Sequence, residues 1–258
     1  MTTSTRPLPD LPDPDRFGGP GWLARTGGVM TPADCARGLR IASRQQVQNL
    51  WERVTSAFRR AADLKDLPSV PDSRLVRLAN EAALEQSPAL LAHGFRSAIF
   101  GRALAYIDGH TVEAELLHVC GVLHDVGLMK AVAGEDFTLR SAAAARRCAC
   151  DAHESEAVGA HLSDALIVHT SVGVTPERDG LLGAYTQYGA MVDLTGLRLS
   201  ALPRAFVAAV LRDYPRGAFK REILQRLGAE ARAVRGGRFD FAQRVGFPAA
   251  VRTAPFKS

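Results

Sequence analysis

The amino-acid sequence predicts an all-α fold, a helical bundle with extra helices at both of its ends. Three observations support this prediction. Apolar residues recur at helical spacing through most of the chain. Typical helix starts, in which a serine or threonine precedes a proline, stand in front of several of these segments. No run of residues alternates between apolar and polar with the period of two that is typical of a strand.

Length and composition indicate a globular protein. The chain has 258 residues, of which 47% are apolar, enough to build a sizeable core. Its four cysteines are too few for a disulfide framework and form no CxxC pair, so we expect reduced thiols. We find neither a signal-peptide pattern nor an apolar run long enough to span a membrane. These features predict a soluble cytoplasmic protein without a membrane partner.

The net charge of +5 is unevenly distributed, since both ends of the chain are basic and the middle is acidic. A basic tail can bind nucleic acid or another anionic partner. The arginines of the C-terminal part, however, stand in segments with ordinary amphipathic helical patterning, such as "FVAAVLRDYPRGAFKREILQRLGAE". We therefore expect these arginines to lie on a solvated surface, and we expect no nucleic-acid partner.

The N-terminal part divides into two segments. Residues 1–28 are rich in proline, aspartate and glycine and are predicted to be extended or disordered. Residues 29–70 are predicted to form a helical extension, with Thr31 as the N-cap and Pro32 in the first helical position. The stretch "LPSVPDSR" then breaks the helical pattern and marks a joint before the next part of the chain.

Residues 71–200 are predicted to form the main domain, with five or six helices from Asp72 onward. One of these helices has Ser87 as its N-cap and ends at Gly109, and the next has Thr111 as its N-cap and ends at Gly127. Residues 201–258 are predicted to form C-terminal helices. We expect them to pack on the central core, because their phenylalanine and leucine positions need burial.

The stretch "LLHVCGVLHDVGL" ends an apolar helical run with His124 and Asp125 side by side. Burying adjacent ionisable groups is costly unless something binds them. Similar polar positions recur at His93, at His169 and at Asp193, each within or at the end of an apolar helical segment. Any one of these could be an ordinary buried polar residue. Together, imidazoles and carboxylates from several helices are typical of a divalent-metal site.

Longer stretches around these residues carry a family resemblance. "PDSRLVRLANEAALEQSPALLAHGFRSAIFG", "EAELLHVCGVLHDVGL", "DALIVHTSVG" and "YGAMVDLTG" resemble, in order and spacing, the HD-domain superfamily of metal-dependent hydrolases. The match is to the branch that includes cyanamide hydratase, over about residues 71–200. The resemblance implies a helical HD fold in which His93, His124, Asp125 and Asp193 bind one divalent metal ion. We expect zinc, with iron or manganese as alternatives.

The resemblance also implies roles for residues near the metal. His169 matches an additional active-site histidine and is our candidate for proton transfer or substrate orientation. Asp125 is expected both to bind the metal and to accept a hydrogen bond from the reacting water. Arg96 matches an arginine for which we expect a structural or substrate-binding role. The chain departs from the family at Thr138, where a glutamate is usual, and at Ser141, where a glycine is usual, which suggests a different substrate preference.

These expectations define a function with alternatives. A metal lowers the pKa of a bound water, so we expect a hydrolase or hydratase acting on a small-molecule substrate such as a nitrile or amide. A phosphohydrolase acting on nucleotides or other phosphate esters would need basic residues at the site, but this part of the chain is acidic. A diiron oxygenase would need a second metal site, for which His153 and His169 are weak candidates. A non-catalytic module would be expected to have lost ligands. A surface left over by the C-terminal helices could support a homo-oligomer, but the sequence leaves the oligomeric state open.

Other polar residues have no predicted role in the site. We expect surface positions for His110 and His118, a polar linker for His153 and His161, and core packing for Tyr185 and Tyr188.

Overall fold

A computed structural model describes residue 6 and residues 8–56 and 63–256 of the chain. Over these residues the protein is all-α, as the sequence predicts, with isolated β-bridges as its other regular pairing. The helices are α1 Pro20–Thr26, α2 Pro32–Ser56, α3 Arg74–Ala83, α4 Pro88–Ile107, α5 Ala114–Leu123, η1 Val126–Met129, α6 Phe137–Asp151, α7 Glu156–Val168, α8 Pro176–Asp179, α9 Leu181–Thr195, η2 Leu199–Ala201, α10 Arg204–Asp213, α11 Phe219–Ala233, α12 Arg238–Arg244 and α13 Phe247–Arg252.

Capping residues explain where several helices begin. The Thr31 hydroxyl accepts a hydrogen bond from the amide of Asp34, whose carboxylate in turn accepts one from the Thr31 amide, so a capping box starts α2. Ser87 caps α4, as predicted. The predicted start of α5 is wrong by two residues, because Glu113 rather than Thr111 occupies the N-cap position.

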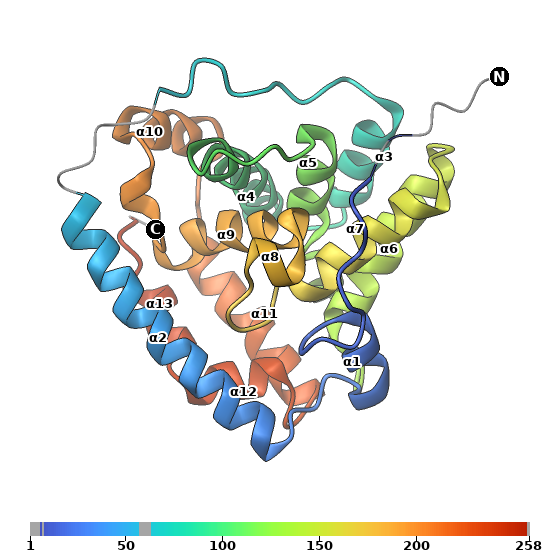
Figure 1. Cartoon of the computed structure of the whole chain (residues 1–258), viewed down its shortest axis with the longest axis vertical. Helices are drawn as coiled ribbons and strands as arrows, with labels where there is room; N and C mark the ends of the chain where they lie inside the picture. The colour runs from blue at the N-terminus through green and yellow to red at the C-terminus, as the bar shows by residue number, and fades with distance from the viewer. Residues whose placement is uncertain (1–5, 7, 57–62, 257–258) are drawn as a thin grey trace.

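Residues 72–196 lie wholly within the described part and form seven α-helices, α3 to α9, where the sequence predicts five or six. The additional helix is α8, a single turn of four residues. In Figure 1, α4 and α9 run close together at the centre of the molecule, and their mutual contact is the most extensive of any helix pair described. Glycines permit this approach: a Cβ on Gly189 would lie 2.0 Å from the Ser97 carbonyl oxygen.

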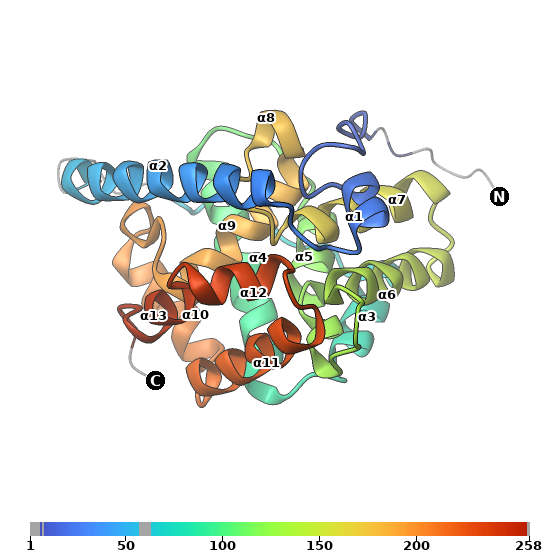
Figure 2. The same ribbon diagram turned by 90° about the horizontal axis from the view of Figure 1, so that it is seen from below.

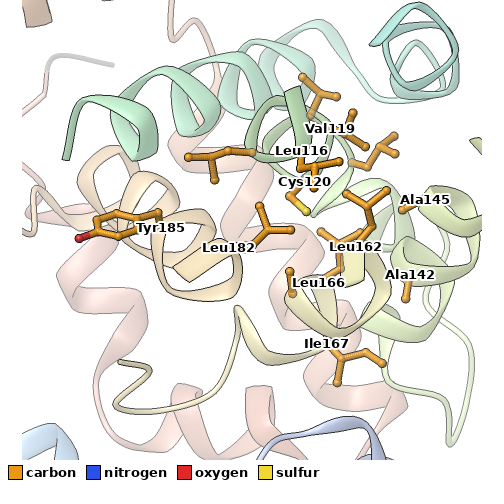
Figure 3. Packing of buried hydrophobic residues seen from close by; sticks show 14 of the residues in the cluster. Leu116, Val119, Cys120, Ala142, Ala145, Leu162, Leu166, Ile167, Leu182 and Tyr185 are labelled. Carbon is orange, nitrogen blue, oxygen red and sulfur yellow. The ribbon is translucent and has the colours of Figure 1, made fainter. Parts of the chain in front are cut away.

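The core fills the space between α5, α6, α7 and α9. Figure 3 shows apolar side chains from these helices pointing toward one another. Leu117, Leu162 and Leu166 are completely buried, and Tyr185 is buried with its hydroxyl donating to Asp108. Burying this much apolar surface is the main contribution that holds the bundle together.

The N-terminal segment requires a correction, because the part from Pro20 to Thr26 is helical and packs on the bundle. Phe17 and Trp22 are buried. Arg16 is also buried and donates to Asp164 on α7, at 2.6 Å, and to Asp179 at 3.2 Å. An extended or disordered state is therefore the wrong prediction for residues 16–26. Residues 1–5 and 7 of this segment, and 57–62 of the next, lie outside the described residues.

The C-terminal helices cover the other side of the bundle, where α11 contacts α4 and α13 contacts α9. Figures 1 and 2 both place α2 beside α12, and a Cβ on Gly38 of α2 would lie 3.2 Å from the Phe241 ring. Two distant segments thus meet over the same face of the molecule. Within the described part of the chain, no helix combines the length and apolar character that crossing a membrane requires.

Candidate metal centre

The His-Asp pair lies at a sharp change of backbone direction. Helix α5 ends at Leu123, His124 is its C-cap, and Asp125 leads into the short helix η1. Gly127 is needed here, because a Cβ at this position would lie 2.1 Å from the carbonyl oxygen of Phe137. The hydroxyl of Ser141 accepts from the Gly127 amide at 3.0 Å and donates to the His124 carbonyl at 2.8 Å. Helix α6 therefore holds the turn that presents both side chains.

Three candidate ligand atoms converge at this turn. The Nε2 atoms of His93 and His124 lie 3.2 Å apart. Asp125 Oδ2 lies 3.3 Å from the His124 Nε2 and 3.7 Å from the His93 Nε2. All three side chains are buried, and they form the group that could hold a metal ion among the described residues.

The other nitrogen of each ring is already bonded. His93 Nδ1 lies 2.7 Å from Asp193 Oδ2, and His124 Nδ1 lies 2.7 Å from the Gly121 carbonyl oxygen. Because both partners are acceptors, each Nδ1 carries the proton and each Nε2 presents a lone pair. Two lone pairs and a carboxylate thus face one another in a buried space, an arrangement that a cation stabilises.

The spacing suits a metal ion. Two imidazole nitrogens bound at about 2.0–2.1 Å to one tetrahedral zinc ion would lie about 3.3 Å apart, close to the 3.2 Å found between the rings. Two imidazoles and one carboxylate are a donor set that borderline divalent ions accept, and three protein ligands leave a position for water or substrate. The residues present therefore fit a metal ion.

The electrostatics of the group favour an anionic Asp125. Burial alone would raise the pKa of its carboxyl group, but His124, His93 and His169 together outweigh burial and lower the pKa to about 2. Burial is also the largest effect on His93, whose pKa is lowered despite the nearby Asp193. At neutral pH, Asp125 is accordingly a carboxylate that faces a neutral His93 ring.

Asp193 takes a different position from the predicted one. Its carboxylate lies behind the His93 ring, bonded to Nδ1, and it is not part of the converging group. Arg96 donates to Asp193 Oδ2 at 2.7 Å, and Arg216 donates to both Oδ1 and the carbonyl oxygen of Asp193. Although burial opposes ionisation, His93 and Arg96 lower the pKa of Asp193 to about 2. In this structure Asp193 holds the His93 ring and lies outside the group that could hold a metal ion.

Arg96 is not among the residues that line the neighbouring cavity of about 870 Å³, so the structure supports the structural rather than the substrate-binding alternative. Its side chain is fully buried and also donates to the carbonyl oxygens of Tyr214 and Pro215. Arg216, which we expected on a solvated surface, is buried against the rings of Phe219 and Phe256. Sequence analysis missed Arg216 because amphipathic spacing alone does not distinguish a solvated arginine from a buried, paired one.

His169 lies beside His124, with ring centroids 5.2 Å apart, at the C-cap of α7. Its Nδ1 donates to the Leu166 carbonyl oxygen at 2.6 Å, which leaves Nε2 as an acceptor. Burial, with a contribution from His124, lowers the pKa of His169 to about 3. The amide of Gln187 donates to the carbonyl oxygens of His169 and Ser171 and fixes the loop that follows.

A cavity of about 870 Å³ opens at His124, Asp125 and His169. Its walls come from elements on both sides of the molecule, α2, α6, α9, α11, α12 and α13. Arg238 also lines it, but this arginine is buried, lies 2.8 Å from Asp136, and donates to Thr138 and to the Ile167 carbonyl oxygen. Thr138 thus serves a structural hydrogen-bond network at this wall.

The remaining histidines lie outside the metal-binding group. His110 is exposed, as expected, but His118 and His161 are buried, so the predicted surface and linker positions are wrong for these two. His153 lies in the turn before α7, whereas His169 follows that helix of 13 residues, about 20 Å away. The two histidines therefore do not share a second metal site. The Tyr188 hydroxyl donates to the Val174 carbonyl oxygen, which is consistent with the expected structural role.

Comparison of the chain with protein-family models gave no match, and comparison with curated proteins gave no relative. The arguments about function therefore depend on the geometry of the site and on the motifs in the sequence.

Proposed function

We propose that this protein is a metal-dependent hydrolase or hydratase of the HD-domain type, acting on a small neutral molecule such as a nitrile or an amide. The observation that carries the proposal is the convergence of His93 Nε2, His124 Nε2 and Asp125 Oδ2 on one buried point beside a cavity. A cluster of this kind beside a pocket is typical of a metal-assisted active site.

A bound zinc, iron or manganese ion would supply a water of lowered pKa and would polarise an electrophilic carbon. The residues of the chain supply the rest. His93 and His124 are held by their Nδ1 hydrogen bonds, so that their Nε2 atoms would be available to hold the ion. His169 Nε2, a free acceptor at the cavity wall, receives a proton or orients a substrate N–H group. The overall reactions are addition of water to a nitrile, giving an amide, or hydrolysis of an amide, giving an acid and ammonia.

The charges around the cavity favour a neutral substrate over a phosphate ester. Arg238 is the one described arginine or lysine that lines the cavity, and its guanidinium is already paired with Asp136. Arg96 and Arg216 lie behind His93 and bind Asp193. Phosphate binding normally uses several cations directed at the ligand, and the described walls of this cavity offer none that is unpaired.

Metal analysis and a reaction panel test the proposal together. Purified protein should contain about one divalent ion per chain, and His124→Gln should lose it. His110→Gln removes an exposed histidine outside the site and should retain the ion, which makes it the matched control. The metal-loaded wild type should then convert nitriles or amides and release no phosphate from nucleotides. Phosphate release, or wild-type protein that binds no divalent ion, would overturn the proposal.

A further inference from the structure

We propose that the substrate of this site carries an extended apolar chain or ring behind its polar reactive group, and is not a one-carbon compound such as cyanamide. This inference rests on the proposed function and specifies the substrate class. The observation behind it is the size of the cavity, about 870 Å³. A water molecule occupies about 30 Å³ in the liquid, and pockets for drug-sized ligands span about 300–1,000 Å³.

The walls of this cavity are largely apolar away from the metal centre. Apolar side chains line it from α9, α11, α12 and α13, among them Met191, Leu194, Ile223, Leu227, Phe239 and Phe247. Water finds few hydrogen-bond partners in such a space, whereas an apolar ligand removes both its own apolar surface and that of the wall from water. The cavity is therefore suited to the apolar part of a ligand.

The arrangement of the wall gives the ligand a direction. Polar groups that can react, those of His124, Asp125 and His169, lie together on one part of the wall. Phe137 packs on the His169 ring at a centroid distance of 6.0 Å and on Phe239 of α12 at 5.2 Å, so an aromatic wall leads away from the site. Val245, which also lines the cavity, is 40% exposed, and we infer that the cavity reaches solvent there.

Charge supports an uncharged chain. Arg238 forms an ion pair with Asp136, and the side-chain amide of Gln187 donates to the carbonyl oxygens of His169 and Ser171. These polar side chains therefore have their partners within the protein. A charged tail would lose its hydration without finding a partner among the described wall residues. A ligand with a neutral polar head and an alkyl or aromatic tail therefore matches both the polar and the apolar part of the cavity wall.

Binding of linear alkyl hydroxamates tests the inference. These neutral molecules place a metal-binding head on a tail of chosen length, and the series runs from acetohydroxamate to decanohydroxamate. Calorimetry with the zinc-loaded full chain should give a Kd that falls by about fourfold for each added methylene over the first several members. A Kd that is constant along the series, or that is lowest for acetohydroxamate, would overturn the inference.

A matched pair of variants assigns the effect to the cavity. Ala250→Trp places a large side chain on the cavity wall. It should raise the Kd of decanohydroxamate by at least about tenfold and leave the Kd of acetohydroxamate unchanged. Ala249→Trp places the same side chain on an exposed neighbour outside the wall and should change neither. Equal effects of the two variants on decanohydroxamate would count against this cavity as the binding site.

Alkyl amides of the same lengths separate this inference from the proposed function. They carry the tail with a weaker metal-binding head. If the metal site is absent but the cavity binds apolar chains, hydroxamates and amides should bind equally, with the same dependence on length. If the metal site is present but the cavity does not take the tail, hydroxamates should bind more tightly than amides at every length, with no dependence on it. Absence of binding by both series would overturn the inference.

Discussion

A buried aspartate lies on each side of the His93 ring, and the two aspartates have different partners. On the cavity side, Asp125 faces two imidazole Nε2 atoms and lines the cavity. On the other side, Asp193 binds the Nδ1 of His93 and accepts from both Arg96 and Arg216. Both carboxyl groups are buried and have a pKa of about 2. The same residue type is therefore anionic in both places for different reasons.

The comparison shows that neighbours, rather than burial or charge, decide what an aspartate can do. Asp193 has its negative charge matched by two guanidinium groups, so it can hold a ring but has little capacity left for an ion. Within the described part of the chain, Asp125 has no arginine among its hydrogen-bond and ion-pair partners, and its Oδ2 is directed at the ring nitrogens. Metal binding is accordingly expected on the cavity side and structural stabilisation on the other.

The largest effect is expected for Asp125→Asn. The amide keeps the shape of the side chain but removes its charge and weakens the oxygen as a ligand. Metal affinity should fall by more than about 100-fold, beyond the range typical of residues that only orient a ligand. Competition with a chromogenic chelator measures the affinity. Thermal unfolding of the metal-free protein should change less than in the Asp193 variant below, and the opposite ranking would reverse the roles assigned to the two aspartates.

Asp193→Asn should instead act mainly on stability. It leaves Arg96 and Arg216 buried without a carboxylate, and breaking a buried ion pair from one side costs about 3–5 kcal/mol. For a chain of this length, the melting temperature should fall by roughly 6–20 °C, with a loss of about 10–100-fold in metal affinity.

Adding Arg216→Gln to Asp193→Asn provides the control for this effect. The double variant removes one unpaired cation and should recover part of the lost melting temperature, as differential scanning calorimetry can measure. The sequence-based interpretation of Asp193 as a metal ligand predicts another outcome. In that case Asp193→Asn would lose the metal as completely as Asp125→Asn does, with little change in the stability of the metal-free protein.

The sequence predicts the helical fold and the cavity side of the site well, because both depend on local signals. Apolar spacing and the caps at Thr31 and Ser87 are encoded within a few residues, and the polar pair His124 and Asp125 interrupts an apolar run. His93 comes from a different helix but stands out for the same reason, as a polar residue within a buried segment.

The environment of Asp193, on the side of the His93 ring away from the cavity, is not predictable from such local signals. Arg216 stands in a stretch with the pattern of an amphipathic, solvated helix, and Arg238 follows that stretch, yet both are buried against carboxylates more than 20 residues away in the chain. Their environment depends on how the C-terminal helices dock on the bundle. Asp193 illustrates the consequence, since a motif identifies it as polar and buried but does not specify which atoms surround it.

His118 is a buried histidine with no carboxylate among its described partners, and it extends the comparison to the pH dependence of stability. His118 on α5 is buried, hydrogen-bonded to Asn80, and near Arg102. Burial, with a smaller effect of Arg102, lowers its pKa from 6.5 to about 4. The folded state thus binds this proton less readily than the unfolded state. The stabilisation is complete above pH 6.5 and is lost as the pH falls toward 4.

His118→Gln removes this titration and keeps a hydrogen-bond donor for Asn80. Urea unfolding of metal-free protein should show the wild type losing about 2–3 kcal/mol more than the variant between pH 7.5 and pH 4. Using metal-free protein excludes acid release of the ion as the cause. Parallel pH profiles for the two proteins would mean that His118 is protonated as readily in the folded chain as in the unfolded one.

The smallest effect is expected on the cavity side, at the support of the His-Asp turn. Ser141 links the Gly127 amide and the His124 carbonyl oxygen through one hydroxyl. Ser141→Ala leaves both buried groups without this partner and should cost about 1–3 kcal/mol in the free energy of unfolding. Metal affinity should fall by less than in Asp193→Asn, because the variant removes no charge near the ligands. Chelator competition on the two variants decides the ranking. A larger loss in Ser141→Ala would mean that backbone position at His124, more than the ionic partner of His93, controls the geometry of the metal site.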